Sequence, residues 1–229
     1  MVELTSPVLG ARCTLVIGDG DCVVVDPGAA RAAAVPAAAS ARGLVVRAIL
    51  LTHAHADHSW DAAPLAARLE VSVHVHTRDA YRLADPFGTL GVLGHAPGGE
   101  GALAQVLRQA GVDPSSYDPP ARVVPFGGEG PGRSPDEVLA FGSVTLTARH
   151  APGHTEGSTI YLVGDVALTG DVLFAGSVGR TDLPGGDERV MATTLREVVA
   201  TLHPTTRVLP GHGPATDIAR ELHHNPYLR

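Results

Sequence analysis

Residues 48–58 read Ala-Ile-Leu-Leu-Thr-His-Ala-His-Ala-Asp-His, an apolar run that leads directly into four side chains able to bind a metal ion. The apolar run predicts a buried strand, so the polar side chains begin where that strand ends. Residues two apart face the same way in an extended chain, so His53 and His55 can converge on one ion while Asp57 and His58 begin the next turn. A metalloprotease helix would instead space its histidines four apart with a glutamate beside the first. The stretch therefore predicts two adjacent metal sites at a strand end.

Three later segments also place a candidate ligand directly after a predicted strand. They are Pro152-Gly153-His154-Thr155, Thr169-Gly170-Asp171 and Pro210-Gly211-His212-Gly213. Glycine lets the backbone approach an ion closely, and loops at one rim of a sheet can converge although they are far apart in sequence. Neutral imidazoles and carboxylates suit Zn(II), Fe(II) and Mn(II), and no thiolate cluster suggests a structural zinc site. The expected site is therefore catalytic.

The remaining histidines are expected at the surface, in the core or at helix caps: His74, His76, His95, His150, His203, His223 and His224.

Length and composition limit the classes of protein to which the chain can belong. With 229 residues and 44% hydrophobic content the chain can bury a large core, and we expect one domain over residues 1–229. A formal net charge of -7 without any basic run argues against a nucleic-acid or membrane-surface partner. The N-terminus lacks a secretory pattern and no apolar stretch could span a bilayer, so a cytoplasmic protein is expected. A turn at Asp19-Gly20 would pair Ile17 with Cys22 and keep Cys13 away from it, which predicts two reduced cysteines.

Periodicity predicts alternating strands and helices with one irregular segment. Residues 85–136 are rich in Gly and Pro and are expected to form an irregular insertion with one helical segment at 101–110, either a lid or a surface excursion. Asp61 is expected to cap a helix that carries Pro64 in its first turn. Strands are predicted at residues 14–26 (a hairpin), 44–51, 71–76, 138–150, 159–169 (a hairpin) and 207–209, and helices at 29–42, 188–202 and 215–223.

The order of the candidate ligands resembles that of the metallo-β-lactamase superfamily. The signature His-x-His-x-Asp-His, then His, then Asp, then His, is matched over residues 53–212. The resemblance implies an αββα sandwich, in which two mixed β-sheets are flanked by helices, with a dinuclear metal site. It implies one metal held by His53, His55 and His154. It implies a second metal held by Asp57, His58 and His212, with Asp171 bridging the two.

Longer strings within the chain are similar to those of glyoxalase II-type (hydroxyacylglutathione) hydrolases. They are Pro152-Gly153-His154-Thr155-Glu156-Gly157-Ser158, Gly170-Asp171-Val172-Leu173-Phe174 with Gly179-Arg180-Thr181-Asp182, and Pro210-Gly211-His212-Gly213-Pro214 leading to Asn225-Pro226. Classical members continue into a helical domain that supplies cationic contacts to glutathione, whereas this chain ends at Arg229. It therefore resembles the short single-domain branch, with glutathione, mycothiol or another thiol as the carrier.

The resemblance implies hydrolysis of a small-molecule thioester by a hydroxide that bridges two divalent ions, zinc first, with iron or manganese as alternatives. Two ions sharing a water lower its pKa from 15.7 towards ~7. Asp57 is the expected catalytic residue, since its second oxygen could orient the hydroxide or accept its proton. Arg180 is expected either to contact a substrate carboxylate or to form an ion pair with Asp182. Thr52 is expected to make supporting hydrogen bonds beside the first ligand.

Two alternatives from other classes remain open at the level of sequence. Persulfide dioxygenases resemble this branch but hold one iron with two histidines and one aspartate, which here would be His53, His154 and Asp171. The string around His212 favours a hydrolase. Another hydrolase of the same fold, such as a lactonase, and a binding module that has lost its activity are the further alternatives.

Overall fold

A computed structural model describes residues 1–96, 99–130 and 132–229, and its strands form two six-stranded sheets. The first sheet is antiparallel from β1 to β3 and parallel from β3 to β8. In spatial order it contains β1 (Val2–Thr5), β2 (Arg12–Ile17), β3 (Asp21–Val25), β4 (Val45–Leu50), β5 (Val73–His76) and β8 (Val123–Phe126).

The second sheet is antiparallel except where β12 and β15 run parallel. In spatial order it contains β16 (Thr216–Asp217), β15 (Arg207–Pro210), β12 (Val166–Gly170), β11 (Thr159–Val163), β10 (Val144–His150) and β9 (Glu137–Phe141). Two small ribbons pair β13 (Leu173–Phe174) with β14 (Ser177–Val178) and β6 (His95–Ala96) with β7 (Gly99–Glu100).

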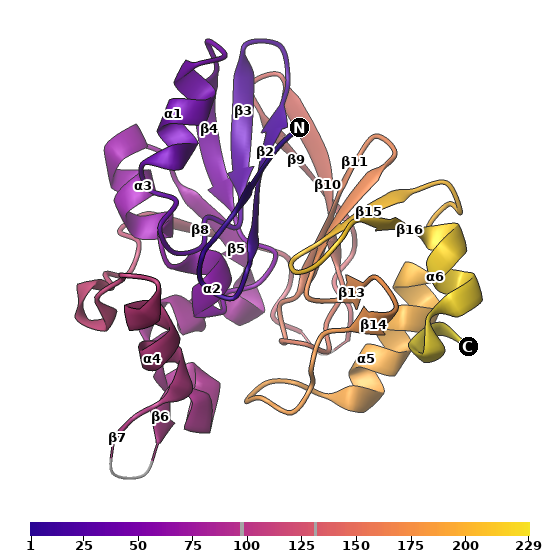
Figure 1. Cartoon of the computed structure of the whole chain (residues 1–229). Helices are drawn as coiled ribbons and strands as arrows, with labels where there is room; N and C mark the ends of the chain where they lie inside the picture. Colours follow the sequence, from indigo (N-terminus) through magenta and orange to yellow (C-terminus); the bar gives the residue numbers. More distant parts are fainter. Residues whose placement is uncertain (97–98, 131) are drawn as a thin grey trace.

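Helices cover the outer face of each sheet, as Figure 1 shows. The α-helices are α1 (Ala34–Ser40), α2 (Ala56–Ser59), α3 (Ala62–Leu69), α4 (Ala102–Gln109), α5 (Glu188–Thr194) and α6 (Ile218–His224). Helices α1 and α3 pack on the first sheet, whereas α5, its π-helical continuation at Leu195–Val199 and α6 pack on the second. Short 3₁₀ segments lie at Thr77–Ala84, Gly88–Leu93, Pro114–Ser116 and Pro226–Leu228.

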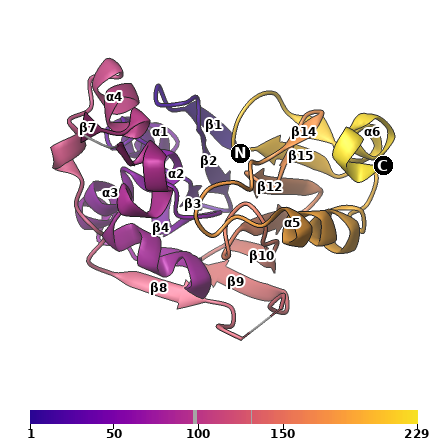
Figure 2. The same cartoon turned by 90° about the horizontal axis from the view of Figure 1, so that it is seen from below.

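The inner faces of the two sheets meet in a shared apolar core. Val23 and Leu50 of the first sheet belong to the same buried cluster as Leu146, Tyr161 and Leu168 of the second. The view from below shows the two sheets between their helical layers (Figure 2). The predicted αββα sandwich of two mixed sheets is confirmed. Because one core joins both sheets, we propose that the chain is a single domain.

The N-terminal hairpin has the predicted register. Ile17 pairs with Cys22, and both Cys13 and Cys22 are buried free thiols. The prediction missed β1, which lies at the edge of the sheet and is only four residues long, too short for its alternating pattern to stand out. It also made the first helix too long, since α1 covers only Ala34–Ser40.

The prediction for residues 85–136 is partly wrong. The helical segment at 101–110 is confirmed as α4, but the insertion ends earlier than expected because β8 pairs in parallel with β5 and completes the first sheet. Pro125 lies within β8, and proline is tolerated there because β8 is an edge strand. Residues 97, 98 and 131 of the segment lie outside the described residues.

The predicted role of Asp61 is also corrected. Asp61 occupies the position before α3, but its side chain makes no capping hydrogen bond to that helix. Its carboxylate instead accepts hydrogen bonds from the backbone amides of Arg31 and Ala32, which precede it by 30 and 29 positions. This contact fixes the loop before α1 against α3.

Among the described residues, no helix has the length and apolar character needed to cross a membrane.

Candidate metal centre

All the predicted ligands follow the carboxyl ends of strands that finish at the same edge of the sandwich. The segment from Thr52 to His58, which includes the start of α2, follows β4, and His154 follows β10 in the facing sheet. Asp171 comes directly after β12, and His212 follows β15. Loops at one edge converge even when they are distant in sequence, and the structure brings all seven predicted side chains together.

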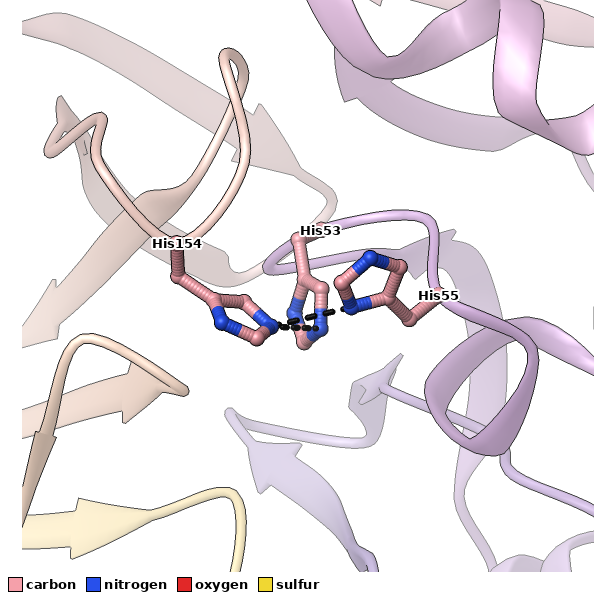
Figure 3. Close-up of side chains that lie close together, drawn as sticks. All are labelled: His53, His55 and His154. Carbon is pink, nitrogen blue, oxygen red and sulfur yellow. Dashed lines mark hydrogen bonds between the residues drawn. The ribbon is translucent and has the colours of Figure 1, made fainter. Parts of the chain in front are cut away.

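His53, His55 and His154 form the first ligand group (Figure 3). His154 Nε2 lies 3.2 Å from His53 Nε2 and 2.9 Å from His55 Nδ1. All three side chains are buried. Two histidines come from one loop and the third from the facing sheet, so the group closes only in the folded chain.

Asp57, His58 and His212 form the second group, with their ligand atoms within 4.8 Å of one another. His212 Nε2 lies 3.2 Å from His58 Nε2 and 3.2 Å from Asp57 Oδ2. His58 is fully buried, whereas the Asp57 side chain is 14% exposed. Asp57 and His212, whose side chain is 25% exposed, are therefore the members of this group that reach the cavity above it.

Asp171 lies between the two groups. Its Oδ1 is 3.3 Å from His58 Nε2, and its Oδ2 is 3.7 Å from His154 Nε2. Oδ1 is buried and accepts no hydrogen bond. A buried carboxylate oxygen without a donor is unfavourable unless a cation compensates it. The position of Asp171 is the one that a ligand shared by two ions would need.

Hydrogen bonds fix the tautomers of His154 and His212 so that their lone pairs face inward. His154 Nδ1 lies 2.7 Å from the carbonyl oxygen of Arg180, and His212 Nδ1 lies 3.0 Å from that of Leu9. Each Nδ1 must carry the proton to donate to a carbonyl, which leaves Nε2 as a bare acceptor. Such lone pairs cannot hydrogen-bond to one another. The donor set of imidazole nitrogens and carboxylates fits divalent metal ions.

Asp26 completes the site and was not predicted from the sequence. Its carboxylate accepts hydrogen bonds from the Thr52 amide at 2.7 Å and the Thr52 hydroxyl at 2.6 Å, and its Oδ2 lies 3.0 Å from His58 Nδ1. Thr52 Oγ1 in turn lies 3.1 Å from His53 Nδ1. The supporting role predicted for Thr52 is therefore confirmed. An Asp before Pro-Gly at the end of a buried strand was the available signal, but turn chemistry explains the same pattern.

The histidines of the two groups differ in the direction of their pKa shifts. Burial and the neighbouring imidazoles hold the pKa of His53 and that of His55 well below the usual value. Burial also opposes the protonation of His58, but the carboxylates of Asp171 and Asp57 outweigh it and raise the His58 pKa. The same pairing outweighs the effect of burial on both aspartates and lowers their pKa values. Both carboxylates are thus ionised at neutral pH, which favours a cation beside them.

Two glycines keep the space around the ligands open. A Cβ on Gly211 would collide with Asp171 Oδ1 and would lie 2.7 Å from His58 Cε1. A Cβ on Gly179 would collide with the Asp171 carbonyl and would lie 3.1 Å from His154 Nδ1. Glycine at these positions allows the loops after β14 and β15 to approach the ligands.

Arg180 forms the ion pair that the sequence left as one of two possibilities. Its Nε and Nη2 each donate to a carboxylate oxygen of Asp182 at 2.7 Å. Both side chains are at least half exposed. Arg180 also lines a cavity of about 350 Å³ over the ligands, together with His55, Asp57, His154, Asp171 and His212.

The discounted histidines do not belong to these ligand groups. His76 and His150 are buried and stacked, with ring centroids 4.0 Å apart. His76 Nε2 lies 3.2 Å from the Ser134 hydroxyl oxygen, and the Ser134 amide donates to His150 Nδ1 at 2.9 Å. This pair fastens β5, β10 and the loop before β9, and its role in the structure is architectural.

Comparison with known protein families agrees with the fold and with the cluster of metal-binding side chains. The sequence model of the metallo-β-lactamase superfamily matches residues 7–212. The chain belongs to this superfamily. Within it, the chain is 36% identical over 211 residues to an uncharacterised protein of Mycobacterium leprae, covering 91% of this chain and 88% of that protein. It is 33% identical over 220 residues to a probable metallo-hydrolase of Bacillus subtilis, YqgX, covering 95% and 92%.

A shorter match is to the hydroxyacylglutathione hydrolase GloC of Haemophilus influenzae. It is 37% identical over 94 residues and covers 40% of this chain and 44% of that protein. Among solved metallo-β-lactamase folds, TTHA1623 in a di-iron-bound form superposes with a TM-score of 0.78 and 31% identity over 100% of both chains. The B3 metallo-β-lactamase BLEG-1 gives a TM-score of 0.77 and 29% identity over 99% of both chains. The fold and the cluster together support the binding of divalent metal ions.

Proposed function

We propose that the protein is a metal-dependent hydrolase that cleaves small-molecule thioesters at a dinuclear centre, in the manner of glyoxalase II. The observation that carries the proposal is the convergence of two complete ligand groups with Asp171 between them. Similarity along nearly the whole chain to a probable metallo-hydrolase supports a hydrolase of this superfamily. Similarity over 94 residues to a hydroxyacylglutathione hydrolase supports the thioester.

The proposed ligands of one ion are His53, His55 and His154, and those of the other are Asp57, His58 and His212, with Asp171 shared. Zinc is the first candidate, and iron or manganese suits the same donors. The di-iron form of a structural neighbour supports two ions rather than one. When bound, the ions would supply Lewis acidity and lower the pKa of water at the site.

The protein's own groups orient the imidazole rings and accept a proton from the attacking water. Asp57 lines the cavity and holds its ionised carboxylate where a proton from the attacking water could be accepted. Asp26 and the carbonyls of Arg180 and Leu9 hold the imidazole rings in one tautomer, so their orientation is set before substrate arrives. A thiol with a pKa near ~8.5 leaves readily as a thiolate, so the site needs no strong acid beside the leaving group.

The second candidate is an oxygenase with one iron held by His53, His154 and Asp171. A structural neighbour named ETHE1, from Myxococcus xanthus, superposes with a TM-score of 0.69 at 24% identity, which is evidence for the fold alone. This alternative uses three of the seven clustered side chains and gives no role to the other four, which are His55, Asp57, His58 and His212. The full second group favours hydrolysis, with a lactonase as the nearest hydrolytic alternative.

A paired assay on one metal-analysed preparation tests the proposal. Cleavage of lactoyl thioesters of several thiols is measured beside oxygen consumption on glutathione persulfide. We expect thioester cleavage without oxygen uptake. Oxygen uptake without thioester cleavage would overturn the hydrolase assignment.

His212→Gln separates the two chemistries further, because it removes one ligand of the second group only. A dinuclear hydrolase should lose most of its kcat/KM and about half of its metal. A mononuclear oxygenase should keep its iron and its oxygen uptake. The matched control is His203→Gln, since His203 is exposed and outside the cluster.

A further inference from the structure

The cavity over the ligand cluster has two walls of opposite chemistry. One wall consists of the proposed ligands. The other is apolar and comes mostly from the segment between β5 and β8, with contributions from Leu90, Leu93, Ala102, Leu103 and Val106. Leu9 and Leu183 extend this wall. A substrate at the ligands therefore lies against apolar side chains.

The apolar wall is anchored in a buried cluster. Leu90 and Leu103 are 7% and 6% exposed and pack with Trp60, which follows α2 and the first ligands. The Trp60 ring lies 5.1 Å from the Tyr117 ring and 5.9 Å from the Phe87 ring, centroid to centroid. Side chains packed in this way form a surface that exists before substrate arrives. The segment therefore contributes a wall of the cavity, and its predicted role as a lid or a surface excursion stays a prediction.

Charge is nearly absent from the lining outside the proposed ligands. Among the described residues that line the cavity, Arg180 is the one other charged side chain. Its guanidinium group is already bound through two hydrogen bonds to Asp182. An anionic substrate group would have to compete with that carboxylate for the guanidinium group of Arg180. The lining thus disfavours a substrate whose recognition depends on carboxylates.

We infer that the site selects thioesters that carry an uncharged, apolar group, which packs against Leu93, Ala102 and Val106 while the thioester lies at the ligands. This inference rests on the proposed thioester hydrolysis. The apolar group can belong to the acyl part or to the thiol, since the wall recognises only its chemistry.

A series of matched thioesters tests the inference. On one small uncharged thiol, N-acetylcysteamine, the acyl group is varied through acetyl, butanoyl and hexanoyl, with succinyl as the charged partner of butanoyl. A second series keeps acetyl and varies the thiol from an alkyl thiol to glutathione. We expect kcat/KM to rise about fourfold per added methylene until the cavity is filled, since each buried methylene contributes about 0.8 kcal/mol. The series that rises identifies which part of the substrate meets the wall. Equal rates for butanoyl and succinyl, with no rise in either series, would overturn the inference.

A pair of lysine variants on α4 tests the position of the wall. Ala102 is exposed and lines the cavity, whereas Gln105 is exposed on the same helix and does not line it. Ala102→Lys should lower kcat/KM for the butanoyl thioester about tenfold and shift the preference towards succinyl. Gln105→Lys should match the parent protein. Identical behaviour of the two variants would contradict the inference.

Binding of stable analogues separates this inference from the proposed function. Butyl and carboxypropyl thioethers of N-acetylcysteamine cannot be hydrolysed, and their affinity for the metal-loaded protein is measured by calorimetry. Preference for the butyl thioether in a protein that cleaves no thioester would reject the proposed function and keep the apolar subsite. Cleavage of all thioesters with no preference between the thioethers would keep the proposed function and reject the apolar subsite.

Discussion

Asp79 and Arg82 form an ion pair in which both side chains are fully buried, with Arg82 Nε 3.3 Å from Asp79 Oδ1. The Asp79 carboxylate also accepts hydrogen bonds from the Ala54 amide at 3.0 Å and from the Thr155 hydroxyl at 2.8 Å. Ala54 lies between the first two proposed ligands, and Thr155 follows the third. One carboxylate therefore fixes two ligand loops that are a hundred positions apart.

Arg82→Met should be severely destabilising. The guanidinium group also binds Glu156 and donates to the carbonyl of Pro184 at 3.0 Å, so its loss leaves the buried Asp79 carboxylate without its counter-ion and the carbonyl without this donor. Removing one partner of a buried ion pair costs about 3–5 kcal/mol of unfolding free energy. Urea denaturation measures the change. Arg180→Met is the matched control, since its pair with Asp182 is exposed and should contribute less than ~1 kcal/mol. Equal effects of the two substitutions would contradict this account.

Asp26→Asn should weaken metal binding while the fold persists. Asp26 has a φ of 54°, a left-handed conformation that asparagine also adopts, so the backbone is preserved. An amide at this position no longer accepts strongly from both Thr52 and His58, and loss of such a partner lowers metal affinity about 10–100-fold. Competition with a chelator measures the affinity. Asp21→Asn serves as the control, because Asp21 binds Arg47 and Ser143 away from the cluster. Unchanged affinity in Asp26→Asn would show that Asp26 does not control the ligands.

Asp171→Ala should remove or scramble both ions, because the shared carboxylate lies between the two ligand groups. Elemental analysis of the purified variant measures metal per chain. His76→Ala is the comparison, since His76 packs against His150 outside the cluster and should leave metal content intact. Two fully occupied sites in Asp171→Ala would contradict the bridging assignment.

The clustering of the proposed ligands could be predicted from the sequence because metal binding restricts residue type and local spacing together. His53 and His55 precede α2, Asp57 and His58 lie in its first turn, and each later proposed ligand follows a recognisable strand. Their supporting residues gave no comparable signal. Asp26 meets His58 across 32 positions, and Asp79 meets Thr155 across 76. A lone aspartate at a strand end or in a 3₁₀ segment is compatible with many surroundings, so only the folded chain reveals its partner.

The sandwich itself was predictable from the alternation of apolar strands and helices, but β8 was not. Pro125 interrupts a four-residue strand, and Val124 is 43% exposed, so the segment lacks both the composition and the alternation of a sheet strand. Pairing with β5 decides its conformation. The apolar wall depends on the same tertiary contacts, since Leu93 and Val106 come from a segment that reads as irregular.

Acid should destabilise the protein through His76 and His150. Burial lowers the pKa of His76 to about 3 and that of His150 to about 4, against an ordinary value of 6.5. Both rings stay neutral in the folded protein but bind protons in the unfolded chain. The unfolded state therefore holds more protons in this range, so the stabilisation is fully present above pH ~6.5 and is lost as the pH falls towards ~4.

The dependence on His76 can be isolated by substitution. His76→Gln keeps an acceptor for the Arg78 amide and a donor for the Ser134 hydroxyl, but its side chain cannot titrate. The unfolding free energy of this variant should therefore fall less steeply between pH 6.5 and 5. The difference in slope should correspond to the uptake of up to about one proton fewer on unfolding. Urea denaturation of the metal-loaded proteins at several pH values measures both slopes, and loss of metal in acid affects both equally. His203→Gln, at an exposed position, should keep the parent slope. Parallel loss of stability in the parent and His76→Gln would mean that the buried pair does not set the acid limit, and that protonation of the clustered ligands does.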